Sequence, residues 1–134
     1  MESEPGGEMA KQAVGAKLWV IPDAYLPAKS TGPLKSHEST CVLNLGRRPA
    51  VVKLVAYFED REPLEGFRVV CPPRRTVHIR LDRLRNAQKQ SIPAAVPFAL
   101  KVESSTRIVV QHTRLDSTQP ALALMTTMAF PAGR

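Results

Sequence analysis

The chain has 134 residues and a formal net charge of +7, from 19 Lys and Arg against 12 Asp and Glu. This is the length of one domain, and 43% hydrophobic with 23% charged residues is a globular balance that excludes disorder along the whole chain. Aromatic residues make only 5%, too few for a groove that stacks the bases of single-stranded nucleic acid. No run of 18 apolar residues occurs, so the pattern predicts no membrane-spanning helix.

The first 16 residues are predicted to be a disordered tail, because they carry three glutamates and a Gly-Gly pair but no apolar period. A single folded domain is expected to cover residues 17–134. The beginning of the chain shows neither the basic nor the apolar region of a secretory signal. Cys41 and Cys71 lie in apolar, strand-like segments, where free buried thiols of a reducing compartment are expected. Together these features predict a cytoplasmic location.

Successive segments of the chain have the period of two that is typical of β-strands, and turn residues separate them. They cover residues 17–21, 36–45, 50–59, 67–71, 74–81, 98–103, 106–112 and 122–130. Residues 22–35 are expected to be a long loop, residues 82–86 a single helical turn, and the last segment, rich in Ala and Met, also allows a helix. The pattern predicts an all-β protein, an antiparallel, jelly-roll-like β-sandwich of about seven or eight short strands.

The cleanest alternation lies in residues 74–81, where Val77 and Ile79 share one face and polar side chains occupy the other. The same reasoning, applied to each segment, predicts one face of every strand that is buried between the layers. The predicted core consists of Leu43, Val52, Leu54, Phe58, Val77, Ile79, Leu100, Ile108 and Val110.

Basic charge is concentrated between residues 61 and 90, which hold eight Lys or Arg against three acidic residues. Arg74, His78 and Arg80 form a row on the polar face of one expected strand. Residues two apart on a strand are about 7 Å apart, a spacing that suits the phosphates of DNA or another anionic partner. The other interpretation is a solvated face that keeps the domain soluble. The row is our first candidate site, for a partner or an anion.

All three histidines, His37, His78 and His112, lie in strand-like segments. Sandwich proteins that bind metal through histidine usually show His-x-His, which is absent here, so no metal site is expected. Neither Ser39 nor Cys41 sits on a Gly-rich elbow, and no Gly-rich phosphate loop occurs. We therefore expect neither an enzyme nor a bound cofactor.

Polar side chains around two of the histidines form a second candidate site. They are His37, Glu38, Gln111, His112, Arg114 and Asp116. We predict that Arg114 pairs with a carboxylate, Asp116 or Glu38, and so fixes one end of the sandwich. The alternative use of the same cluster is a pocket for a small ligand, a sugar or an anion.

Three stretches of the chain carry a resemblance to a known family. They are residues 36–44 (Ser-His-Glu-Ser-Thr-Cys-Val-Leu-Asn), 73–80 (Pro-Arg-Arg-Thr-Val-His-Ile-Arg) and 109–117 (Val-Val-Gln-His-Thr-Arg-Leu-Asp-Ser). With Tyr57-Phe58 and residues 126–130, they resemble the soluble sensory-rhodopsin transducer family over about residues 18 to 131. The Gln-His-Thr-Arg-Leu-Asp run is long and specific.

The resemblance implies a small cytoplasmic β-sandwich that assembles into a homotetramer. It also implies docking to the cytoplasmic face of a microbial rhodopsin, with DNA as another partner, and it carries over no catalytic residue. Residues 122–125 are apolar on both alternate faces, which supports assembly, because one sandwich covers only one face of a strand. Our leading interpretation is a non-enzymatic signalling or regulatory module; the alternative is a sandwich that binds a small ligand.

Overall fold

The computed structural model describes residues 14–133, so most of the expected tail lies outside the described residues. Within that range there is no helix, and all strand pairs are antiparallel. The strands are β1 (Ala16–Ala24), β2 (His37–Asn44), β3 (Ala50–Phe58), β4 (Leu64–Cys71), β5 (Arg75–Arg80), β6 (Phe98–Asp116), β7 (Ala123–Met128) and β8 (Phe130–Gly133). The predicted all-β, antiparallel sandwich is confirmed.

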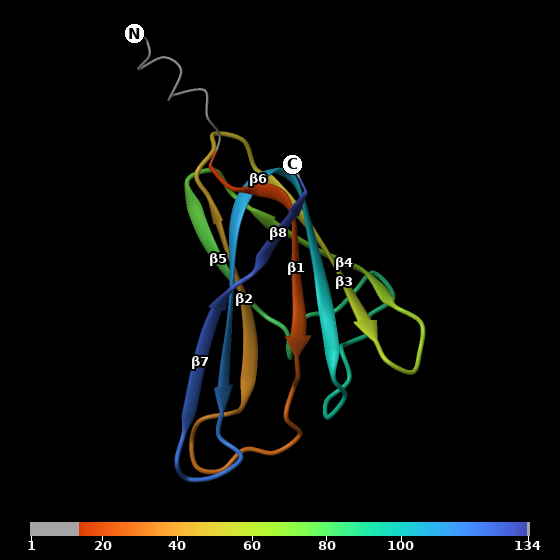
Figure 1. The fold of residues 1–134 in the computed structure, drawn as a ribbon, viewed down its shortest axis with the longest axis vertical. Coiled ribbons are helices and arrows are strands. Elements are labelled where there is room, and N and C mark those ends of the chain that lie inside the picture. Colours follow the sequence, from red (N-terminus) through yellow and green to blue (C-terminus); the bar gives the residue numbers. More distant parts are fainter. Residues whose placement is uncertain (1–13, 134) are drawn as a thin grey trace, which may run out of the picture.

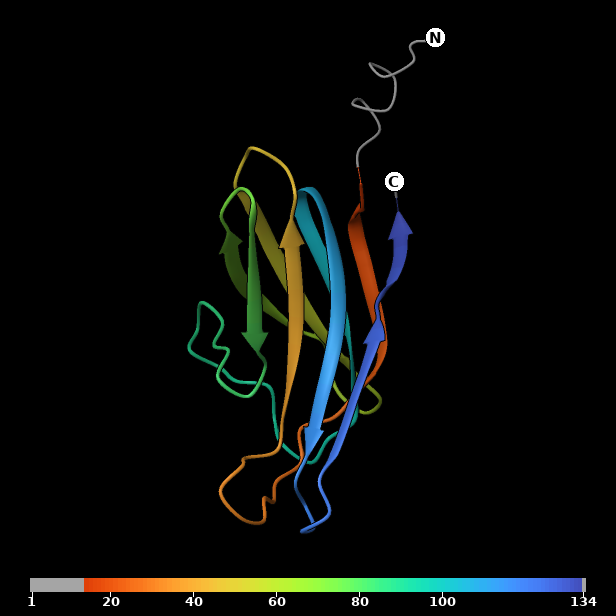
Figure 2. The ribbon, with the colours of Figure 1, turned by 90° about the vertical axis from the view of Figure 1, so that its left-hand side faces the viewer.

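Two sheets form the layers of the sandwich. The first has the strand order β4-β3-β6-β1-β8, and the second joins β5, β2, β6 and β7. Figures 1 and 2 show the layers from two directions at right angles. Buried side chains of both sheets meet between them, such as Leu54 and Leu100 from the first and Val42 and Ile79 from the second.

β6 belongs to both sheets, although its residues were expected to form two strands. Residues 98–104 pair with β3 and residues 109–115 pair with β2, in one continuous strand of 19 residues. Where the strand changes sheets, Ser104 Oγ accepts the Thr106 N–H at 3.3 Å and Ser105 Oγ accepts the Val51 N–H at 2.9 Å. These hydroxyl groups replace backbone partners, because a strand that passes between layers cannot pair on both sides there.

Both ends of the chain differ from the prediction in detail. β1 runs through Pro22 to Ala24, with a register irregularity between Ile21 and Ala24 that accommodates the missing proline N–H. The apolar run of residues 122–130 is two strands separated at Ala129: β7 pairs with β6 in the second sheet, and β8 pairs with β1 in the first. The expected helical turn at residues 82–86 does not form, since turns and irregular structure occupy these positions.

The predicted core is correct except on β2. Val52, Leu54, Ile79, Leu100, Ile108 and Val110 are buried, and Phe58 and Val77 pack partly buried against them. Leu43, however, is 38% exposed, so its assignment to the core is wrong. β2 instead buries the face that carries Glu38, Thr40, Val42 and Asn44, whose polar groups have hydrogen-bond partners inside the protein.

Candidate functional site

A buried polar network lies between β2 and β6, with Glu38 as its centre. Glu38 is 0% exposed and His112 is 4% exposed, so both groups have left water almost entirely. The strand register places Glu38 opposite Arg114 and Thr40 opposite His112. Alternation then points all four side chains to the inner face of the second sheet.

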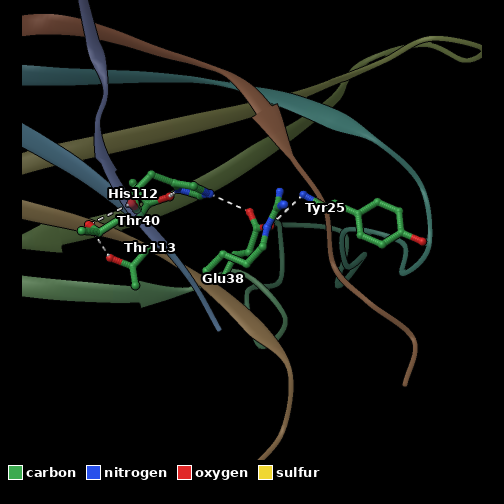
Figure 3. A network of polar contacts seen from close by, with 7 residues as sticks. Tyr25, Glu38, Thr40, His112 and Thr113 are labelled. Atoms are coloured by element: carbon green, nitrogen blue, oxygen red, sulfur yellow. Dashed lines mark hydrogen bonds and ion pairs between the residues drawn. The ribbon is translucent and has the colours of Figure 1, made fainter. Parts of the chain in front are cut away.

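The carboxylate of Glu38 has three partners from two parts of the chain, β6 and the connection that follows β1 (Figure 3). His112 Nε2 lies 2.6 Å from Glu38 Oε1, and Arg114 Nε donates to Glu38 Oε2. The backbone N–H of Tyr25, in the connection that follows β1, donates to the same Oε2 at 3.0 Å. Thr40 Oγ1 lies 3.3 Å from His112 Nδ1 and completes the imidazole's contacts.

This set of partners offsets the cost of burying a carboxylate. A buried charge without partners is strongly destabilising, whereas here the guanidinium of Arg114 neutralises it and three hydrogen bonds satisfy its oxygens. Because the Glu38 carboxylate can only accept, His112 Nε2 carries the proton and donates a hydrogen bond to Glu38. In the neutral ring, Nδ1 then accepts a hydrogen bond from the Thr40 hydroxyl. The network can therefore tie the connection after β1 to both central strands of the second sheet.

Three of the six residues predicted for this site lie together: Glu38, His112 and Arg114. The predicted pairing of Arg114 with a carboxylate is confirmed, and Glu38 is the partner. The other three lie elsewhere. His37 Nδ1 is 2.8 Å from the Lys35 carbonyl oxygen, and Gln111 lines a shallow hollow on the outer face of the second sheet.

Asp116, the sixth residue, belongs to the end of β6. Its Oδ1 accepts from the Thr118 hydroxyl at 2.6 Å and from the Thr118 N–H at 2.9 Å. These hydrogen bonds, the hydroxyl first, lower the pKa of Asp116 below its ordinary value, and the charge of Arg114 adds to the effect. Asp116 thus stabilises the turn that leads to β7.

A serine pair next to the network was not predicted. Ser36 Oγ accepts the Ser117 N–H at 2.8 Å, and Ser117 Oγ donates to the Leu34 carbonyl at 2.7 Å. Both serines are buried. No sequence signal distinguishes them from exposed serines, because only the pairing of β2 with β6 brings positions 36 and 117 together.

The predicted basic row is divided in the structure. Arg74 and His78 are exposed, as expected for side chains that face away from the core. Arg80 Nε and Nη2 bind Asp82 at 2.8 and 2.9 Å, and Lys35 adds a contact of 3.5 Å to the same carboxylate. Burial opposes ionisation of Asp82, but the hydrogen bond and charge of Arg80 outweigh it, and the pKa of Asp82 is lowered. Arg74 precedes β5 and has φ 57°, so it belongs to a turn.

The edge formed by β7 and β8 is apolar and exposed. All six residues of β7 are exposed, and Leu124 reaches 73%. Met125 and Met128 point to opposite faces of the strand, and both are exposed, as is Phe130 in β8. Among the described residues, β7 pairs with β6 on one side and with no strand on the other, so that side presents unpaired backbone groups. Residues 122–125 carry apolar side chains on both faces of the strand, and in this subunit both faces are exposed.

Residues 14–133 show neither a metal cluster nor a membrane-spanning helix. They contain no group of three or more His, Cys, Asp or Glu side chains arranged to hold a metal ion. They also contain no helix with the length and apolar character needed to cross a membrane.

A family model and a solved structure point to the same family. The family model of the Anabaena sensory rhodopsin transducer matches residues 14–131. The crystal structure of Thermotoga maritima 1070 is similar at 35% identity and a TM-score of 0.79, over 88% of this chain and 96% of that one. The structure of the Anabaena sensory rhodopsin transducer is similar at 39% identity and a TM-score of 0.70, over 81% of this chain and 96% of that one. A search of curated proteins found no match.

Proposed function

The chain belongs to the Anabaena sensory rhodopsin transducer family, and from this premise we propose that it is a non-enzymatic signalling module of the cytoplasm. In this proposal it assembles into a homotetramer, and the tetramer binds the cytoplasmic face of a rhodopsin-type receptor. The support is the family match over nearly the whole described chain, together with a surface suited to assembly.

The observation that carries the proposal is the exposed apolar edge of β7 and β8. Large apolar side chains rarely cluster at a free strand edge of a monomer, because such an edge recruits other strands. Here they do cluster: Leu122, Leu124, Met125, Met128 and Phe130 are all exposed. A second copy of the chain covers this edge in our proposal, and symmetry then repeats the contact around the tetramer.

The assembly is tested by light scattering on the purified chain and on Leu124→Glu. Since Leu124 is 73% exposed, the substitution leaves the fold of one subunit intact and places charge in the proposed contact. We expect a tetramer for the unchanged protein and smaller species for the variant. Val70→Glu, at an exposed position on β4 at the opposite edge of the first sheet, is the matched control and keeps the tetramer. A monomeric unchanged protein at micromolar concentration contradicts the proposal.

Receptor docking is tested with a microbial rhodopsin in nanodiscs of zwitterionic lipid. We expect the full chain to bind the discs that carry receptor and to ignore empty discs. Binding to neither kind of disc, by a chain shown to be tetrameric, removes receptor docking from the proposal. We propose DNA as a second partner, as the family resemblance implies, and duplex DNA is tested in the experiment of the next subsection.

For the Glu38 network we infer a structural role within this module. Glu38, His112 and Arg114 satisfy one another, and Glu38 is fully buried. A ligand site normally offers polar groups that await a partner. The network holds the second sheet in the form that presents the β7 edge.

A further inference from the structure

Two turns of the sandwich bring four arginines to one end of the molecule. Arg47 and Arg48 lie in the turn between β2 and β3, and Arg74 and Arg75 lie where β4 gives way to β5. All four are exposed. Both turns lie at the same end in Figure 2, the first in gold and the second in light green. We call these four residues the arginine end.

Asn44 holds the two turns together. Its side-chain nitrogen donates to the Arg48 carbonyl oxygen at 2.8 Å in one turn and to the Cys71 carbonyl oxygen at 3.1 Å beside the other. Its Oδ1 accepts the Gly46 N–H at 2.9 Å, and Asn44 is also paired with Arg75 across β2 and β5. Asn44 is fully buried, so the cluster is built into the fold rather than assembled by chance at the ends of flexible loops.

Among residues 14–133, no carboxylate forms an ion pair with any of the four arginines of the arginine end. The ion pairs found within residues 14–133 involve other cations, and the stretches 44–50 and 71–76 contain no acidic residue. The acidic residues Glu59, Asp60 and Glu62 instead lie in the connection from β3 to β4, at the other end of these strands. The stretches that form the arginine end therefore carry positive charge with no acidic residue of their own.

We propose that the arginine end binds a surface of anionic phospholipid headgroups. Arginine matches phosphate with paired N–H donors, and each basic side chain near such a surface strengthens binding about fivefold. Apolar side chains accompany the charges: Leu45, between Asn44 and the arginine turn, is 55% exposed, and Leu43 is 38% exposed. A lipid interface accepts both kinds of group, since apolar side chains enter the headgroup region while arginines meet phosphates.

Lipid fits this surface better than duplex DNA does. Basic side chains at phosphate spacing would also bind DNA. The DNA backbone, however, has no apolar surface for an exposed leucine, which could meet apolar groups only at the base edges in a groove. The arginine end also has no helix that enters a groove and no aromatic side chain among residues 44–50 and 71–76. For its biological setting this inference rests on the proposed docking to a membrane receptor, since it specifies which end of the module faces the bilayer.

The test is co-sedimentation of the full chain with vesicles that contain no receptor. One set is pure phosphatidylcholine, and the other contains about one-third phosphatidylglycerol as the anionic lipid. We expect binding to the anionic vesicles only, and a fall in affinity when salt is raised. Arg47→Gln/Arg75→Gln is expected to weaken this binding about 30-fold, since two basic contacts are lost.

Matched variants separate the site from net charge. Arg83→Gln/Arg85→Gln removes two exposed arginines of the connection between β5 and β6, and we expect a change below about twofold. Leu45→Ser leaves the charge intact and weakens binding about fivefold in our expectation, whereas Leu34→Ser, at another exposed leucine, has no effect. Circular dichroism of each variant verifies the fold.

Three results overturn the inference. The first is equal binding to both kinds of vesicle, and the second is an equal loss in the two arginine variants. The third is binding to duplex DNA, lost in Arg47→Gln/Arg75→Gln, without binding to anionic vesicles, which assigns the arginine end to nucleic acid. Because the vesicles hold no receptor and the nanodiscs of the docking experiment hold no anionic lipid, failure of one experiment leaves the other proposal standing.

Discussion

Glu38 and His112 are 74 residues apart in the chain, yet Glu38 Oε1 and His112 Nε2 lie 2.6 Å apart in the interior. β2 and β6 bring them together, and Arg114 on the same strand as His112 supplies the compensating charge. The contact connects the two central strands of the second sheet between buried side chains. Its loss is therefore expected to affect the whole domain.

Glu38→Gln is predicted to lower the free energy of unfolding by about 3 kcal/mol, because it breaks a buried pair and leaves Arg114 and His112 without their anion. Urea unfolding followed by circular dichroism measures the change. Glu65→Gln, an exposed carboxylate in β4, is the control and is expected to stay within about 0.5 kcal/mol of the unchanged protein. A Glu38→Gln loss no larger than that of the control contradicts the structural role.

Ile79→Ala is predicted to lower the free energy of unfolding by about 2 to 5 kcal/mol, since it leaves a cavity among buried side chains. Leu43→Ala removes a similar volume from the exposed face of β2, and we expect a loss below about 1 kcal/mol. The comparison, by urea unfolding, tests which face of each strand is inside. A loss below about 0.5 kcal/mol for Ile79→Ala contradicts the assignment.

Acid unfolding is predicted to depend in part on Asp82. Its pKa is lowered in the folded state, so it contributes stability above the ordinary pKa of an Asp, and that contribution is lost as pH falls through the lowered value. Arg80→Gln removes the main partner and reduces the difference in stability between pH 7 and pH 3. Because Arg80 is partly exposed, the effect is at most about 1 kcal/mol. An unchanged pH profile in Arg80→Gln contradicts this contribution; Arg83→Gln is the control.

Both cysteines are predicted to react slowly with iodoacetamide near neutral pH. They are free thiols, and burial raises the pKa of Cys41 and of Cys71, so little thiolate is present. Cys71 is fully buried and Cys41 only partly, which predicts that Cys41 is modified first. Mass spectrometry after timed labelling, with the urea-unfolded chain as the fast reference, gives the order. Faster labelling of Cys71 contradicts the predicted exposure.

Local patterns in the sequence were sufficient for the class of fold and for most of its interior. Alternation of apolar and polar residues depends only on the two-residue period of a strand, so Val52, Leu54, Ile79 and Val110 were placed correctly in the core. The family resemblance rested on contiguous motifs such as residues 111–116, and the match over residues 14–131 confirms it. Such information is carried by neighbours in the chain and needs no three-dimensional contact.

Tertiary structure alone decided which face of β2 lies inside. Each face of β2 carries both apolar and polar residues. The face with Leu43 is the more hydrophobic one, so the sequence favoured it for the core. The pairing with β6 reverses the choice, because Arg114 and His112 there give Glu38 the partners that make its burial possible. The arginine end has the same origin. Positions 47, 48, 74 and 75 lie at one end because β2 pairs with β5 and Asn44 binds backbone groups of both turns, long-range contacts that local patterns do not record.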